Sequence, residues 1–294
     1  MTIPQRYATA IVSVLILVAG FVLVTNRYIP NTDFATLQAY TVPVSSLVAG
    51  NITHVKVSDN QKVTTGDLLF GIDPEPVNIS LTQAQEAYQV AHEHFQSLNR
   101  LFQSNNVSRD DFLQASKALY LNARSLSEAR YQQKHILTYA PVSGYVTNLE
   151  ARPGQYAETG QRIMTLIDDS DWWIYSNVKE NNLTRVYPGQ TVLVSLNSCP
   201  GVVIRGQVAT IARGVDIDET GPSGLAQVER TSNWIRLAQR FPVRVAFDRT
   251  QLPESCMLYN GTTAITTILT VDNVLSRAVA SAIQQLRTHL QYLY

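Results

Sequence analysis

Two stretches of this chain repeat one another without gaps, 94 residues apart. When Gly50 is aligned with Gly144, apolar residues align with apolar residues, glycine aligns with glycine and glutamine aligns with glutamine. The pairs are Ile52 with Val146, Thr53 with Thr147, Val55 with Leu149, Gln61 with Gln155, Val63 with Ala157, Gly66 with Gly160, Leu69 with Ile163 and Ile72 with Leu166. Each copy alternates apolar and polar residues as a half-buried strand does, with a glycine turn before a second apolar run. We therefore expect one small β domain made of two halves, residues 40–75 and 137–169.

The segment between the halves, residues 76–136, has a helical period instead. Its apolar residues recur at alternating spacings of four and three, which is the seam of a coiled coil. They are Ala84, Tyr88, Ala91, Phe95, Leu98 and Phe102 before a polar break, and Phe112, Ala115, Leu119, Leu126, Ala129 and Ile136 after it. After the break, Ser108 and Asp111 have the form of a capping box that starts a second helix. The sequence predicts an antiparallel coiled-coil hairpin that interrupts the β domain.

The N-terminal segment 7–26 is uncharged and strongly apolar. At about 1.5 Å per residue, a helix of this length spans about 30 Å, which matches the hydrocarbon core of a membrane. A cleaved signal peptide would have a shorter apolar core followed by small residues, and that pattern is absent. We expect an uncleaved transmembrane helix bracketed by Arg6 and Arg27, with a periplasmic or extracellular body after it.

Residues 170–270 consist of short apolar runs separated by turn residues, without a helical period. Pro188-Gly189, Pro200-Gly201 and Asn260-Gly261 mark the turns, and five to seven short strands of this kind predict a small barrel or sandwich, here assigned as a β-barrel domain. Residues 271–294 have apolar residues at helical spacing, which predicts a helical tail either near the membrane surface or on the protein surface. The expected fold is mainly β, with an α-helical coiled-coil hairpin and an N-terminal transmembrane helix.

Composition and motifs exclude several functions. Lys and Arg number 23, Asp and Glu also number 23, and no basic run occurs, so nucleic acid is not an expected partner. No nucleophile elbow, phosphate-binding loop or paired acid and base motif is found, so we expect neither an enzyme nor a cofactor. His92 and His94 lie two apart on a helix, a spacing that cannot chelate one metal.

The two cysteines, Cys199 and Cys256, lie outside any CxxC motif. In an oxidising compartment they could pair, and otherwise they are two separate small buried residues. The second interpretation is favoured here.

Several motifs give the chain a family resemblance. Val48-Ala49-Gly50-Asn51-Ile52, Asp59-Asn60-Gln61 and Gly66-Asp67-Leu68-Leu69-Phe70-Gly71-Ile72-Asp73 carry it in the first half, and Ala140-Pro141-Val142-Ser143-Gly144 and Gly154-Gln155 in the second. These motifs resemble those of the membrane fusion proteins of the HlyD and EmrA type, which are also called periplasmic adaptors. The order of the parts is also similar: a membrane anchor, the first half of the β domain, the hairpin, the second half and then the barrel. The segment from Asn233 to Val245 is similar to adaptors of multidrug and aromatic carboxylic acid exporters. In this family the two halves form a biotinyl-lipoyl-like domain.

The resemblance also implies one contact site, and the residues themselves suggest a second. Family adaptors dock on an outer-membrane channel of the TolC type through a hairpin tip where an Arg, a Leu and a Ser recur. Leu101 and Ser108 fit the spacing of the last two, but the Arg position falls on Ser97, and Arg100 lies three residues later. Ser108 is equally well explained as a helix cap. A second candidate is a cationic patch formed by Arg236, Arg240 and Arg244, which could guide an anionic aromatic solute or contact the pump, with a solvated strand face as the alternative.

The resemblance implies a non-catalytic adaptor that links an inner-membrane transporter to an outer-membrane channel for export of drugs or aromatic acids. The chain would be a single-pass inner-membrane protein with its bulk in the periplasm. A ring of three or six copies is expected, because one hairpin cannot wall a conduit. The alternative is an envelope-anchored binding module without a role in transport.

Overall fold

The computed structural model describes residues 30–214, 239–253, 255–271 and 274–290. These fall into two compact units, one formed by Tyr40–Ser170 and the other by the described residues on either side of it. Two long strands, β1 (Asn31–Ser45) and β8 (Arg162–Lys179), contribute residues to both units. Within the described ranges, no helix is long and apolar enough to cross a membrane. The anchor expected at residues 7–26 lies outside the described residues.

The two halves of the repeat interlock into one β domain instead of forming two separate lobes. In the first half lie β2 (Gly50–Val55), β3 (Lys62–Val63) and β4 (Leu68–Ile72). The second half contains β5 (Leu137–Tyr139), β6 (Gly144–Thr147), β7 (Tyr156–Ala157) and the start of β8. Strand β2 pairs with β7, β3 with β6 and β4 with β5, so each of these pairs joins one half to the other.

A single apolar core lies between the two halves. Its largest fully buried side chains come from both copies, since Ile52, Phe70 and Ile72 pack in the same cluster as Met164 and Leu166. Burial of apolar side chains is worth roughly 25 cal/mol per Å². Neither half could bury this surface alone, so the domain requires both halves of the chain to come together.

Equivalent positions of the repeat have equivalent turn geometry. Asn60 and Gly154 are one aligned pair, and both adopt the left-handed backbone conformation, with φ of 63° and 88°. The next aligned pair, Gln61 and Gln155, also acts alike: each side chain accepts a hydrogen bond from the backbone N–H three residues earlier. Asn is among the few side chains that tolerate a positive φ, so it can replace Gly at this turn.

In the first half, Asp67 closes a turn in the same way, but with a charged side chain in place of an amide. Its carboxylate accepts the backbone N–H of Thr64 at 2.7 Å, and this hydrogen bond lowers the pKa of Asp67 because it favours the ionised form. The aligned residue in the second half is Gln161, whose side-chain oxygen accepts from Glu158 N at 2.9 Å. A carboxylate and an amide thus close the same turn.

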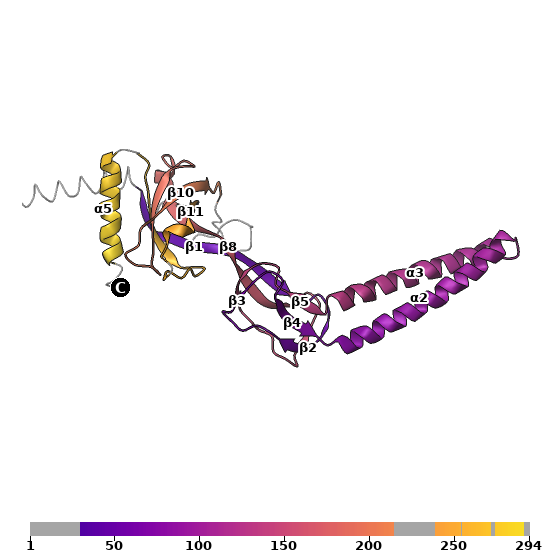
Figure 1. Ribbon diagram of the computed structural model, residues 1–294. Coiled ribbons are helices and arrows are strands. Elements are labelled where there is room, and N and C mark those ends of the chain that lie inside the picture. Colours follow the sequence, from indigo (N-terminus) through magenta and orange to yellow (C-terminus); the bar gives the residue numbers. More distant parts are fainter. Residues whose placement is uncertain (1–29, 215–238, 254, 272–273, 291–294) are drawn as a thin grey trace, which may run out of the picture. The chain divides into compact units, whose positions relative to one another are not determined.

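The insertion forms an antiparallel pair of helices, α2 (Pro74–Gln103) and α3 (Arg109–Lys134), which lie side by side in Figure 1. Asp73 caps α2 by accepting from Glu75 N, and Pro74 takes the first helical position, where its missing N–H is not needed. The helices pack through the heptad seam. Its buried members are Leu81, Ala91, Ala115, Leu126 and Ala129.

The other unit is a β-barrel built from six of the described strands. To β1 and β8 it adds β9 (Thr191–Leu196), β10 (Ile204–Ile211), β11 (Arg240–Phe247) and β12 (Thr263–Ile268). The strands follow in the order β1, β12, β9, β10, β11 and β8, and β1 pairs again with β8, which closes the ring. The short helices α4 (Glu180–Leu183) and η1 (Arg249–Gln251) connect strands.

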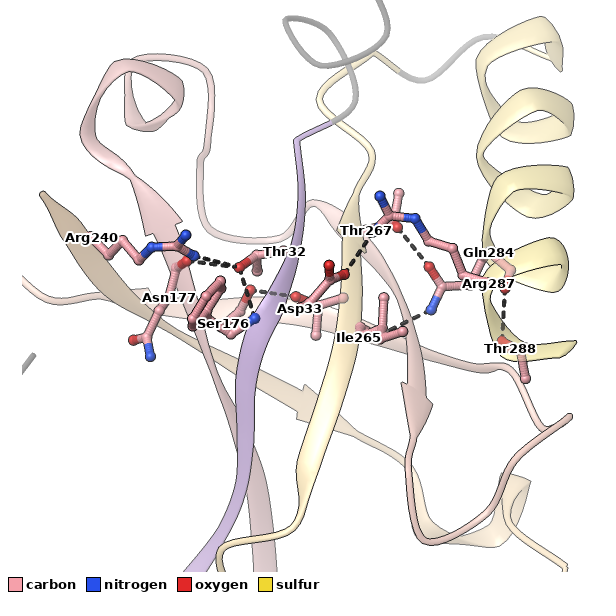
Figure 2. Close-up of polar contacts among 12 residues, drawn as sticks. Thr32, Asp33, Ser176, Asn177, Arg240, Ile265, Thr267, Gln284, Arg287 and Thr288 are labelled. Carbon is pink, nitrogen blue, oxygen red and sulfur yellow. Dashed lines mark hydrogen bonds and ion pairs between the residues drawn. The ribbon is translucent and has the colours of Figure 1, made fainter. Parts of the chain in front are cut away.

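The C-terminal helix α5 (Val274–Leu290) packs against the barrel (Figure 1). Ala280 is buried with Leu193 and Leu269 in a small apolar cluster. Gln284 is fully buried, accepts from Thr267 Oγ1 at 2.7 Å and donates to the carbonyl of Ile265 at 3.1 Å (Figure 2). Because a buried amide is costly unless it is hydrogen-bonded, these bonds hold α5 in one position. The structure thus shows a helix within the expected tail, packed on the barrel.

Cys199 and Cys256 form a disulfide across a sequence separation of 57 residues, with their Cα atoms 5.6 Å apart. The preference for two separate buried cysteines was therefore wrong. The sequence could not decide the question, because Cys199 follows β9 and Cys256 precedes β12, and these strands become neighbours only in the folded barrel.

Candidate functional site

The tip of the hairpin is a short connection between Gln103 and Arg109 whose shape is set by backbone and side-chain caps. Asn105 adopts a left-handed conformation with φ of 55°. The N–H of Asn106 then donates to the carbonyl of Leu101 at 2.9 Å, which satisfies one of the last acceptors of α2. Ser104 Oγ also donates to the Leu101 carbonyl, at 3.0 Å. This closed turn holds the last residues of α2 and the first residues of α3 in a defined position.

Ser108 is the N-cap of α3. Its Oγ accepts from Asp111 N at 3.1 Å and donates to the Asp111 carboxylate at 2.7 Å. Replacing a serine N-cap by alanine typically costs about 1 kcal/mol of helix stability. The hydroxyl of Ser108 is thus already engaged within the chain, which agrees with its structural interpretation.

Arg100 and Leu101 are exposed at the end of α2, and Leu113 is exposed at the start of α3. Beneath them, Phe112 stacks on Phe102 with ring centroids 4.7 Å apart, and its centroid lies 5.5 Å from that of Phe95. The aromatic cluster fixes the two helix ends to each other. The tip therefore offers a rigid surface of exposed leucines and a guanidinium, which is suited to docking on another protein.

The second candidate, the arginines of β11, lies on the barrel. Arg240 is half-buried, and its guanidinium lies 3.6 Å from the ring centroid of Phe34 on β1. Its Nη1 also donates to Thr32 Oγ1 at 3.3 Å, and Thr32 Oγ1 donates to the Asn177 carbonyl at 3.0 Å (Figure 2). Phe34 itself is 56% exposed, so a flat cation and an aromatic ring are presented together at the surface. Cation–π contacts of this kind are worth about 0.5–1 kcal/mol at exposed sites.

Arg244 has a different environment. Its guanidinium lies 4.3 Å from the ring centroid of Trp173, and its Nη2 pairs with the Asp171 carboxylate at 3.2 Å. The carboxylate neutralises much of the positive charge that was expected to attract an anion. Arg236, the third member of the expected patch, lies outside the described residues.

The aromatic partners Phe34 and Trp173 were not identified from the sequence. They come from β1 and β8, and Phe34 is more than 200 residues away from Arg240. Only the closure of the barrel brings these residues together. Among the described residues, no cluster of three or more His, Cys, Asp or Glu side chains is arranged to hold a metal ion.

The architecture is that of an adaptor: a β domain split by a coiled-coil hairpin and followed by a barrel. The chain matches the barrel-sandwich hybrid domain of RND membrane fusion proteins over residues 40–169 and the AAEA-like β-barrel domain over residues 171–270. The chain belongs to the membrane fusion protein family.

Two curated relatives cover nearly the whole chain. The uncharacterized protein YdhJ of Escherichia coli K12 is 31% identical over 276 residues, which span 88% of this chain and 95% of the relative. The multidrug resistance protein MdtN of the same strain is 28% identical over 330 residues, with 89% and 95% covered.

Solved structures show the same fold. A MacA–MexA chimeric protein, which carries the Pseudomonas aeruginosa MexA α-hairpin domain, superimposes with a TM-score of 0.63 at 22% identity and covers 83% of this chain and 82% of that one. The membrane fusion protein Spr0693 of Streptococcus pneumoniae R6 has a TM-score of 0.59 at 16% identity, with 82% and 97% covered.

Proposed function

We propose that this chain is the periplasmic adaptor of a tripartite efflux system, in which it links an inner-membrane transporter to an outer-membrane channel. The observation that carries the proposal is the hairpin of α2 and α3, whose base is fixed because the strands next to it, β4 and β5, pair within the split β domain. A rigid arm with an exposed tip positions other proteins and supplies no catalytic group. The multidrug resistance protein MdtN, which aligns with 89% of this chain, favours drugs as the transported class. Aromatic acids enter the proposal only through the resemblance of residues 233–245 to adaptors of aromatic carboxylic acid exporters.

We place the chain in the inner membrane through the apolar segment 7–26, with the rest in the periplasm. Disulfides persist in oxidising compartments such as the periplasm, and the bond between Cys199 and Cys256 is consistent with that location. The partners are then the transporter, the membrane, an outer-membrane channel of the TolC type and further copies of this chain in a trimer or hexamer. Nucleic acid has no place in this assembly.

Co-purification in mild detergent tests the adaptor function. A tagged full-length chain is expected to bring down a polytopic transporter and, after cross-linking in cells, an outer-membrane channel. The same tag on an unrelated single-pass periplasmic protein is the control. An envelope-anchored binding module would bring down neither partner, and that result would contradict the proposed adaptor function.

We further propose that Arg240, with Phe34 beside it, contacts an anionic aromatic solute or the pump. Within the described residues, Arg240 contacts Phe34 and Thr32 and forms no ion pair with a carboxylate, whereas Arg244 is paired with Asp171. The tip residues Arg100, Leu101 and Ser108 are proposed to contact the channel. Here Leu101 and Arg100 supply the exposed surface, and Ser108 keeps α3 capped.

Reversing both charges, Arg240→Glu with Arg244→Glu, is expected to lower export of acidic aromatic compounds by about tenfold, because an attractive field becomes repulsive. Export of uncharged compounds is expected to change much less. The double substitution to lysine keeps the charge but loses the planar stacking on Phe34 and Trp173, and serves as the matched control. Export assays in whole cells measure both classes, and unchanged export of acids would rule out the solute contact.

A further inference from the structure

A groove of about 800 Å³ lies between α5 and the barrel strands β9, β10 and β11. One wall is a face of α5, because Arg277, Ser281 and Gln285 are spaced four residues apart and are all exposed. This wall is about 12 Å long at the rise of an α-helix. The matched barrel domain ends at residue 270, so α5 adds the wall to that domain. The groove has the size of sites that bind small organic molecules.

The lining of the groove includes an apolar surface. Leu193 of β9 and Leu269, which follows β12, line it and are buried, and the half-buried Val203 and Phe247 line it as well. Leu193, Leu269 and Val203 also belong to the apolar cluster that packs on Ala280 of α5. Covering apolar surface releases water and is favourable. This part of the groove therefore favours a ligand with an apolar body.

Arg205 of β10 adds an exposed guanidinium to the lining. Its backbone is held by the side chain of Gln251: the Arg205 N–H donates to Gln251 Oε1 at 2.9 Å, and the Arg205 carbonyl accepts from Gln251 Nε2 at 3.1 Å. Within the described part of the chain, the guanidinium of Arg205 forms no ion pair. The backbone is thus fixed, while the charged end of the side chain is left for a ligand.

The charges of the groove favour an anion. Its charged lining residues, among those that the structure describes, are Arg205, Arg277 and Asp248, so two cations and one anion leave one net positive charge. Asp248 Oδ1 accepts the backbone N–H of Thr250 at 2.9 Å, and this hydrogen bond lowers the pKa of Asp248 because it favours the ionised form. A guanidinium can bind a carboxylate through two parallel N–H groups. The groove therefore complements a carboxylate head joined to an apolar body.

We infer that this groove binds a small amphipathic carboxylate, with its head on Arg205 and its apolar body over Leu193 and Leu269. Arg277 adds positive charge on the side of α5. The inference goes beyond the proposed adaptor function and does not depend on it. All the lining residues belong to the barrel unit of one copy, so binding requires neither a transporter nor a channel.

Protection of an introduced cysteine tests the site in the purified full-length chain, with the native disulfide intact. Ser281→Cys places a thiol in the groove, and Ala282→Cys, exposed outside the groove lining, is the matched control. The probe is octanoate, and octanamide is its uncharged counterpart. We expect octanoate to slow alkylation of the Ser281→Cys thiol in a saturable way and to leave Ala282→Cys unaffected. The concentration dependence gives the Kd, and octanamide should bind about tenfold more weakly, because it lacks the charge-assisted hydrogen bonds.

Charge substitutions in the Ser281→Cys chain identify the head-binding residue. Arg205→Gln is expected to raise the Kd for octanoate about tenfold, since the charge-assisted hydrogen bonds are lost. Asp248→Asn should lower it about threefold, because a repelling charge is removed while the amide oxygen can still accept from Thr250 N. Arg213→Gln, which changes an exposed arginine beyond the other end of β10, is the control and should leave the Kd unchanged.

Hydrogen exchange of the unsubstituted chain provides a second measurement, in which octanoate should slow exchange of the amides of α5. No protection in either measurement, up to the concentration at which octanoate forms micelles, overturns the site. Equal protection by octanamide, or an unchanged Kd in Arg205→Gln, contradicts the carboxylate class. Equal protection of Ala282→Cys shows non-specific coating and also overturns the site. Co-purification of the transporter and channel is measured separately, so the adaptor function stands or falls independently of these results.

Discussion

Replacement of residues 73–135 by a two-residue Asn-Gly turn is expected to abolish export while leaving the β domain folded and the chain in the membrane. The backbone already brings the two ends together, because Ile72 N donates to the carbonyl of Ile136 at 2.8 Å and Gly71 pairs with Leu137. Asn-Gly is the preferred two-residue connection of a β-hairpin, so β4 and β5 would be joined without strain. Removal of the arm would take away the proposed contact with an outer-membrane channel and leave the core that supports the arm.

The measurement is whole-cell export together with membrane fractionation of the same variant. As a control, the full hairpin with Gln85→Lys changes one exposed side chain of α2 and should export normally. Hydrogen exchange of the amides in β2, β4 and β6 reports whether the shortened domain is folded. Export at the normal level by a folded variant lacking the hairpin would contradict the adaptor mechanism.

Gly144→Ala is expected to destabilise the split β domain by about 3 kcal/mol, at the upper end for overpacking. Gly144 begins β6 and lies opposite Asp168 of β8. A Cβ atom at this position would lie 1.9 Å from the carbonyl oxygen of Ile167, which is backbone and cannot move aside as a side chain could. The strands must therefore separate, and the shared core of the two halves is disturbed.

Gly160→Ala separates this steric effect from simple backbone strain. Gly160 has a φ of 83°, but an added Cβ atom would have no neighbouring atom within 4 Å among the described residues. Only the left-handed conformation is therefore penalised, by roughly 1–2 kcal/mol. Hydrogen exchange of the buried amides within residues 40–170 measures both variants in the full-length chain. A smaller loss for Gly144→Ala than for Gly160→Ala would show that the strands adapt to the added carbon.

Local periodicity was sufficient to recognise the main parts of the fold. The repeat aligned Asn60 with Gly154 and Gln61 with Gln155, and the structure gives each pair the same turn role. The heptads on both sides of Ser108 correspond to α2 and α3, since a spacing of three and four places side chains on one helix face wherever the helix forms. Such patterns are local, so they can be read without knowing how distant segments meet.

The barrel side was less predictable. Three contacts join segments that are far apart in the sequence and become neighbours only when the strands of the barrel pair. They are the disulfide between Cys199 and Cys256, the stacking of Arg240 on Phe34 and the pairing of Arg244 with Asp171. An alternating pattern shows which residues of a strand share a face, but it does not show which strand lies alongside. Within the described residues, Arg240 and Arg244 of the expected patch each have a different set of partners.

The order of residues alone was enough to establish a split β domain, an inserted hairpin and the family to which they point, because each rests on short-range spacing. The tertiary structure decided how the two halves share one core and where α5 is held through Gln284. It also decided which residues of α2 lie beside which residues of α3, such as Asn78 beside Gln133 and Phe102 beside Phe112. Those features depend on the pairing of strands and on the antiparallel register of α2 against α3, and both are set by long-range packing that no local period contains.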